Sequence, residues 1–168
     1  KTGSGMMDCK KALVESNGDF EKAIDILRKK GQKVSASRSD RKTSEGVVLY
    51  RLNDENSKGF ILSFTCETDF VAKNEDFLNF VKELSDLNNS CSSNIEKLNK
   101  SIMNNNKSVE ENLVSLIAKI GEKITIGRTK TVGLKNVKNF TYQPSVIKEN
   151  ISKLAVIACL ETNQFSEQ

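Results

Sequence analysis

The chain has 168 residues, of which 37% are hydrophobic and 29% are charged, with a formal net charge of +4 and no histidine. This length and composition are typical of one globular domain, or of one domain with a small appended module. Without histidine or a Cys-x-x-Cys pair, the sequence excludes a zinc framework, Ser–His–Asp or Cys–His catalysis and an imidazole switch. The longest apolar run, at residues 154–160, is too short to cross a bilayer and no secretory leader is visible, so we expect a cytoplasmic protein without membrane contact.

The positive charge is concentrated in the N-terminal quarter of the sequence. Residues 1–42 carry 11 Lys and Arg against 6 Asp and Glu, whereas residues 43–168 carry 15 against 16. Such an excess attracts an acidic protein, RNA or an anionic surface and is too small to choose among them, and a solvated face is its ordinary interpretation. A nucleic-acid-binding module at residues 1–42 therefore stays open as an alternative, and it predicts a steep loss of affinity with salt.

Two short helices are predicted at the start of the chain. The first covers residues 6–14 and ends at Asn17-Gly18, a pair that readily supplies a left-handed residue. Asp19 then suits an N-cap, and an apolar stripe follows until Gly31, where we expect the second helix to end. Because two such helices bury little by themselves, we expect a third helix before Lys1.

Met6 and Met7 are adjacent in the first of these helices. On a helix they point about 100° apart, so both cannot face one narrow apolar stripe. One of them is therefore expected to be exposed, either as adaptable contact surface for a partner or at a frayed helix start.

A charged linker and a β-hairpin come next. Residues 32–46 contain almost no large apolar side chain and are predicted as a linker with partial helix at most. Residues 47–52 and 60–65 then form the two strands of the hairpin. Apolar residues alternate along the second strand as far as Cys66, which predicts an interior strand with a buried thiol.

The period of the apolar residues changes after Cys66, because a helix with one apolar stripe is predicted around residues 77–84. At the joint, Thr68 or Asp69 could be an N-cap with Phe70 folded back as a hydrophobic staple. Alternatively, Phe70 is an anchor for a pocket on a partner, with Asp69 acting beside it. An acid–base enzyme that uses Glu67 and Asp69 is a further alternative, which lacks an accompanying nucleophile.

The rest of the chain predicts one strong helix and further strands. Residues 88–107 are rich in asparagine and serine and predict a weak surface helix or a helical hairpin tip. Ser108 and Glu111 match a capping box ahead of a helix at 109–120. A strand starts at residue 124, and the run at 154–160, with Cys159, reads as a strand covered on both sides, so we expect a layered α+β domain whose C-terminus is incomplete.

Two long motifs, with a shorter third, carry a resemblance to a known family. They are TGSGMMDCKKAL at residues 2–13, CETDFVAKN at 66–74 and IAKIGEKI at 117–124. With this order and spacing the sequence resembles elongation factor Ts, from residue 2 to about residue 128 and weakly beyond. Lys123 stands in the third motif where the family leads us to expect asparagine.

The resemblance implies an architecture for the chain. A small N-terminal helical module similar to ubiquitin-associated domains would occupy residues 1–31, without its first helix, and a basic linker would follow at 32–46. An α+β dimerisation-type core with antiparallel strands and helices would then have its N-subdomain at 47–132 and the start of an incomplete C-subdomain at 133–168. The resemblance leaves a homodimer open.

It also implies a function, that of a guanine-nucleotide exchange factor that binds the GDP form of elongation factor Tu. In the family a Thr-Asp-Phe-Val segment inserts into the GTPase domain of that partner and disturbs its Mg²⁺ and phosphate site, and its counterpart here is Thr68, Asp69, Phe70 and Val71. The contact of the N-terminal module with the same partner is matched by Met6, Met7, Lys10 and Lys11. Such a factor is not an enzyme in the usual sense, and no cofactor, metal ion or direct nucleic-acid contact is expected.

Overall fold

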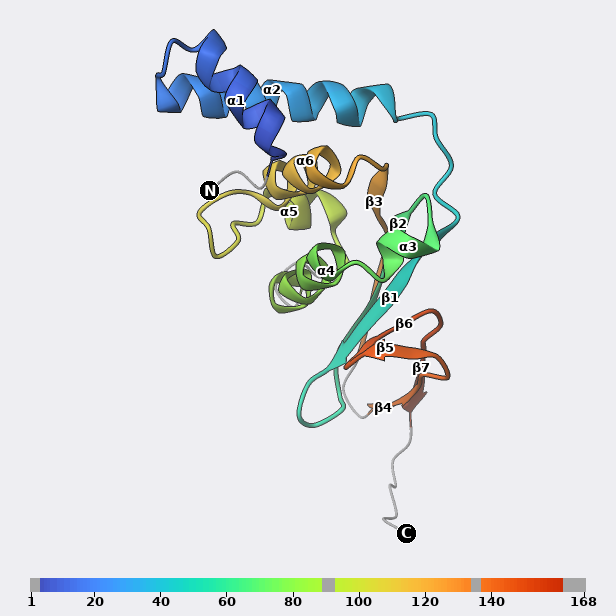
Figure 1. Cartoon of the computed structure of the whole chain (residues 1–168). Helices are drawn as coiled ribbons and strands as arrows, with labels where there is room; N and C mark the ends of the chain where they lie inside the picture. Colours follow the sequence, from blue (N-terminus) through green and yellow to red (C-terminus); the bar gives the residue numbers. More distant parts are fainter. Residues whose placement is uncertain (1–3, 89–92, 134–136, 162–168) are drawn as a thin grey trace.

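The computed structural model describes residues 4–88, 93–133 and 137–161, in which helices and antiparallel strands are mixed (Figure 1). The predicted α+β class is confirmed. In chain order the elements are α1 (Met6–Glu15), α2 (Phe20–Ser37), β1 (Glu45–Leu52), β2 (Gly59–Cys66), α3 (Asp69–Ala72), α4 (Glu75–Asn88), α5 (Ile95–Lys100), α6 (Val109–Ile120), β3 (Ile124–Val132), β4 (Val137–Tyr142), β5 (Val146–Lys148), β6 (Ile151–Ser152) and β7 (Val156–Glu161).

The turn between α1 and α2 forms as the sequence predicts. Asn17 and Gly18 both adopt positive φ, at 51° and 83°, and end α1. The Asp19 side chain then accepts a hydrogen bond from the backbone N–H of Lys22 and caps α2. The two helices pack against each other through the buried Ala12 and Ala23, above the rest of the molecule (Figure 1).

The prediction that the second helix ends at Gly31 is wrong, because α2 continues to Ser37 and takes in part of the predicted linker. A Cβ atom at Gly31 would lie 3.0 Å from the Cβ of Ala118 and 3.4 Å from Cγ1 of Val114, both on α6. Glycine therefore allows α2 and α6 to approach closely. That packing offsets the roughly 1 kcal/mol that glycine costs inside a helix relative to alanine. The division of the chain into domains stays a prediction.

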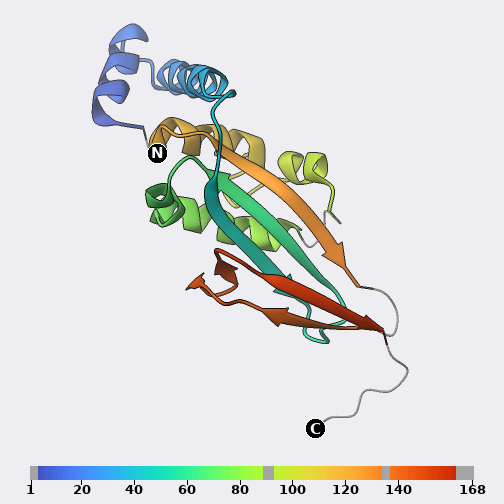
Figure 2. The same ribbon diagram turned by 90° about the vertical axis from the view of Figure 1, so that its right-hand side faces the viewer.

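The main sheet has five antiparallel strands in the order β3-β2-β1-β6-β5, and α4, α5 and α6 cover one of its faces (Figure 2). The predicted hairpin is confirmed, since β1 pairs with β2 along its whole length from Glu45↔Cys66 to Leu52↔Gly59. β2 is an interior strand, as predicted, and its alternate residues Phe60, Leu62, Phe64 and Cys66 are buried.

Aromatic packing joins α4 to the middle of this sheet. The ring of Phe64 lies 4.7 Å from that of Phe77 and 5.4 Å from that of Phe80, between centroids. α6 begins with the predicted capping box of Ser108 and Glu111 and ends at Gly121, whose φ is 81°. The aromatic contacts thus hold α4 against β2 close to the end of that strand.

For the polar stretch 88–107 the sequence predicts a weak surface helix or a helical hairpin tip, and the structure has one short helix there, α5. Leu98 in α5 and Met103 after it are buried in the core, whereas Ile102 is exposed. Residues 89–92 of this stretch lie outside the described residues.

The prediction for residues 154–160 is wrong about burial. β7 pairs with β4 in a separate two-stranded sheet, and Val156, Cys159 and Leu160 are exposed in the part of the chain that the structure describes. An unbroken apolar run shows that a strand tolerates burial on both faces, but it does not show that other elements cover it. None of the described helices is long and apolar enough to span a membrane.

Candidate functional site

The joint between β2 and α4 is a short corner, which we define as residues 67–73. Thr68 has extended backbone angles and caps α3, with its Oγ1 accepting from the N–H of Val71 at 3.5 Å. α3 is only four residues long, and its inward positions are taken by the buried Val71 and Ala72. Phe70 therefore points outward and is 81% exposed. The cap predicted at Thr68 is confirmed, and the alternative in which Phe70 folds back as a staple is wrong.

Asp69 lies beside Phe70 and keeps its charge. Its carboxylate accepts a hydrogen bond from Nζ of Lys73 at 3.0 Å, one helical turn further on. This bond from the Lys73 ammonium is the main reason why the pKa of Asp69 is below its ordinary value. The corner thus presents a large apolar ring next to a partly exposed carboxylate.

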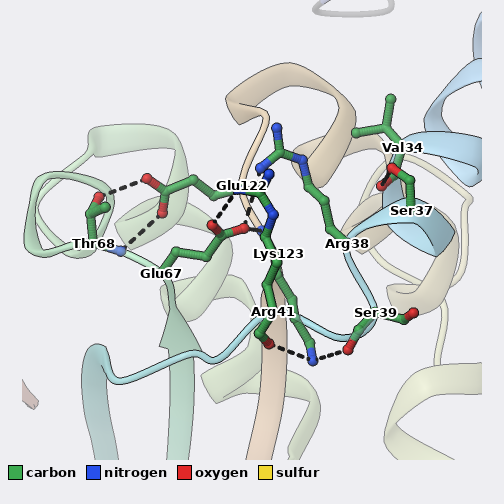
Figure 3. Close-up of polar contacts among 9 residues, drawn as sticks. All are labelled: Val34, Ser37, Arg38, Ser39, Arg41, Glu67, Thr68, Glu122 and Lys123. Carbon is green, nitrogen blue, oxygen red and sulfur yellow. Dashed lines mark hydrogen bonds and ion pairs between the residues drawn. The ribbon is translucent and has the colours of Figure 1, made fainter.

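The corner is also held by Glu122, in the turn between α6 and β3. One carboxylate oxygen of Glu122 accepts the hydroxyl proton of Thr68 at 2.7 Å, and the other accepts the backbone N–H of Thr68 at 3.1 Å (Figure 3). Because the hydroxyl donates to Glu122, its lone pair is free to accept from Val71. Glu122 therefore orients the same side chain that caps α3.

Glu67 makes the reverse contact, from the corner to that turn (Figure 3). Its carboxylate accepts the backbone N–H of Lys123 at 2.6 Å, and also pairs with Arg38 at 3.3 Å and Arg41 at 2.9 Å. These contacts lower the pKa of Glu67, the bond from the N–H of Lys123 most of all. A carboxylate held ionised by this set of donors is a poor general base, which argues against the acid–base alternative.

Lys123 joins the same cluster to the segment after α2. Its Nζ donates to the backbone carbonyl oxygen of Arg41 at 3.0 Å and to that of Ser39. An asparagine side chain, which the family resemblance leads us to expect here, is too short for this contact.

The four residues predicted for the N-terminal contact lie on α1. Met6 is 85% and Met7 63% exposed, and Lys10 and Lys11 are exposed as well. A shallow, open depression of about 580 Å³ lies along this helix and is lined by Met6, Cys9, Lys10, Leu13, Val14, Asn17 and Gly18. Each alternative for the methionines predicted that one of the two side chains is exposed. In the structure both are exposed.

The cysteine that precedes the corner does not supply a reactive thiol. Cys66 is buried, and burial raises the pKa of its thiol to about 12, so it is a packing residue, as predicted. Within the described residues no cluster of three or more Cys, Asp or Glu side chains is able to hold a metal ion.

The sequence did not reveal the residues that hold the corner. Arg38 and Arg41 lie 29 and 26 positions before Glu67, and Glu122 lies 54 positions after Thr68. No local pattern links residues so far apart, and the one signal was that Glu122 belongs to the third motif.

Comparisons with known proteins identify the family. The model of the family described as "Elongation factor TS" matches residues 67–167. The chain is 50% identical over 131 residues to an elongation factor Ts of Christiangramia forsetii, covering 78% of this chain and 47% of the relative. It is 41% identical over 163 residues to that of Rickettsia typhi, covering 97% and 52%. The chain thus spans about half the length of these relatives, and it belongs to the elongation factor Ts family.

Proposed function

We propose that this chain binds the GDP form of elongation factor Tu and accelerates the release of GDP, with Phe70 as the anchor of the contact. The observation that carries the proposal is an almost fully exposed phenylalanine on a braced corner, inside the segment that matches the family model. Burying such a ring on the free protein would be favourable, so its exposure needs a reason. A pocket on a partner supplies that reason.

The residue types at the corner suit the displacement of a bound nucleotide. Phe70 would enter between elements of the GTPase domain, and Asp69 would compete for groups that hold Mg²⁺ and the phosphates. Neither residue needs to bind the metal ion itself. Thr68 and Val71 would set the direction of the insertion, because one caps α3 and the other fixes it to the core.

Exchange then follows from thermodynamic linkage. If this chain lowers the affinity of the partner for GDP by some factor, GDP lowers the affinity of the partner for this chain by the same factor. No covalent bond is formed or broken, so the chain acts without enzyme chemistry. We also propose that the exposed Met6 and Met7, with Lys10 and Lys11, form a second contact with the same partner.

The nucleic-acid alternative loses part of its support, because several of the basic residues at 1–42 are paired with carboxylates. Arg38 and Arg41 are engaged by Glu67, Lys30 pairs with Asp8, and Arg28 lies 3.7 Å from Glu111. Cations that are paired within the protein contribute less to phosphate binding.

Stopped-flow release of a fluorescent GDP from elongation factor Tu tests the proposal. The wild-type chain is expected to accelerate release, and Phe70→Ala to slow it roughly 30-fold, because an anchor of this kind contributes about 2 kcal/mol. The melting temperature of Phe70→Ala is expected to stay close to that of the wild type, since the ring is exposed.

Phe140→Ala is the matched control, because Phe140 is also a partly exposed phenylalanine, 48% exposed on β4. It is expected to leave the release rate unchanged. Equal losses from both substitutions, or no acceleration by the wild-type chain, would contradict the proposed function.

A further inference from the structure

Backbone pairing between β2 and β3 ends at Cys66↔Ile124. Just beyond this pair, each segment uses a side chain to accept a backbone N–H of the other segment. Glu67 accepts the backbone N–H of Lys123, and Glu122 accepts the backbone N–H of Thr68. Each segment thus satisfies a donor of the other with a carboxylate. We call this reciprocal pair, Glu67 and Glu122, the carboxylate brace (Figure 3).

The corner needs such support, because four residues are far too few for a helix that is stable by itself. Val71 and Ala72 bury one side of α3, but both lie in the second half of the helix, so their packing does not hold Thr68 in front of it. The contacts of Glu122 with Thr68 are charge-assisted, and one of them is as short as 2.7 Å. They fix the residue from which α3 starts.

We propose that Glu122 is a positioning residue, which fixes the direction in which Phe70 leaves the surface by holding Thr68. Glu67 completes the brace and attaches the end of α2 to it through Arg38 and Arg41. The role of this brace in exchange rests on the proposed function, whereas its effect on the order of the corner does not. An anchor that is already ordered loses less conformational entropy on binding, so the entropic cost of binding is smaller.

The order of the corner can be measured without any partner. The chain contains no tryptophan, so Phe70→Trp gives a single tryptophan at an exposed position, whose fluorescence can be excited selectively over that of the two tyrosines. Adding Glu122→Ala is expected to lower the fluorescence anisotropy of this reporter, and Glu122→Gln, which keeps one acceptor oxygen, to lower it less. Glu83→Ala, on the exposed face of α4, is the control and should leave it unchanged.

Exchange is then measured on chains without the tryptophan substitution, with Phe70 either present or replaced by alanine. Glu122→Ala is expected to slow GDP release about tenfold in the wild-type background, and less than about twofold once Phe70→Ala is present, because coupled residues are not additive. A purely structural role would give the same loss in both backgrounds.

The outcomes separate the two proposals. Unchanged anisotropy in Glu122→Ala, or equal losses of exchange with and without Phe70, would overturn the positioning role. If the wild-type chain does not accelerate release, the proposed function is lost, and the anisotropy alone decides whether the brace orders the corner.

Discussion

Glu67 is the residue at which three segments of the chain meet: the corner, the turn before β3 and the end of α2. Its side chain is only 15% exposed, and its charge is balanced by Arg38 and Arg41. Its lowered pKa means that the folded protein favours the ionised form more strongly than the unfolded chain does. Glu67 therefore stabilises the fold fully above its ordinary pKa of 4.5, and this contribution is lost as the pH falls through the lower pKa of the folded state.

The direction of this pKa shift gives a prediction for the stability of Glu67→Gln. The variant is expected to be less stable than the wild type at pH 7, and the difference should shrink steadily below pH 4.5. Urea unfolding of both proteins across this range measures it. Comparing the two proteins cancels the parallel effect of Asp19, Asp69 and Glu111, whose pKa values are also lowered. A difference that stays constant down to pH 3 would show that the brace does not depend on the charge of Glu67.

At the scale of elements, the contact between α2 and α6 joins the N-terminal helices to the core. Gly31→Leu places a side chain where even a Cβ atom would lie 3.0 Å from Ala118, so α2 must move away from α6. We expect a cost of 1–3 kcal/mol, the usual range for overpacking, and a lower melting temperature. Gln32→Leu introduces the same side chain at an exposed neighbouring position and should leave melting nearly unchanged. Equal melting of the two variants would contradict the close packing of α2 on α6.

The elements also show what the sequence could predict and what it could not. The turn at Asn17-Gly18 and the capping box of α6 were predictable, because each depends on residues close together in the chain. The passage of α2 through Gly31 was not, since its cause is Ala118 on a distant helix. The exposure of Phe70 was one of two open alternatives, and the burial of Val71 and Ala72 decided between them.

At the scale of the whole molecule, the two proposed contact sites are linked through α2. Asp8, next to Met7, pairs with Lys30, and Arg38 at the end of the same helix reaches Glu67 at the corner. Lys30 and Arg38 are eight positions apart, which corresponds to a rise of about 12 Å along the helix. α2 therefore connects α1 to the corner through these two ion pairs, an arrangement that would allow one partner domain to contact both proposed sites.

Two linked contacts have separable effects on binding and on rate. In the proposed function Phe70 would act where the nucleotide is held, whereas Met6 and Met7 would add affinity by keeping the partner close. The double variant Met6→Ser, Met7→Ser is therefore expected to raise, severalfold, the concentration that gives half-maximal GDP release, with little change in the maximal rate. Phe70→Ala should lower the maximal rate itself.

A titration of the release rate against the concentration of this chain measures both quantities. Val146→Ser is the control, because Val146 is 62% exposed on β5, far from α1 (Figure 1). It replaces one exposed apolar side chain by the same serine on a distant strand and should change neither quantity. If the methionine variant lowers the maximal rate as Phe70→Ala does, α1 takes part in displacing the nucleotide and the two sites act as one. If it changes nothing, the exposed face of α1 does not contact this partner.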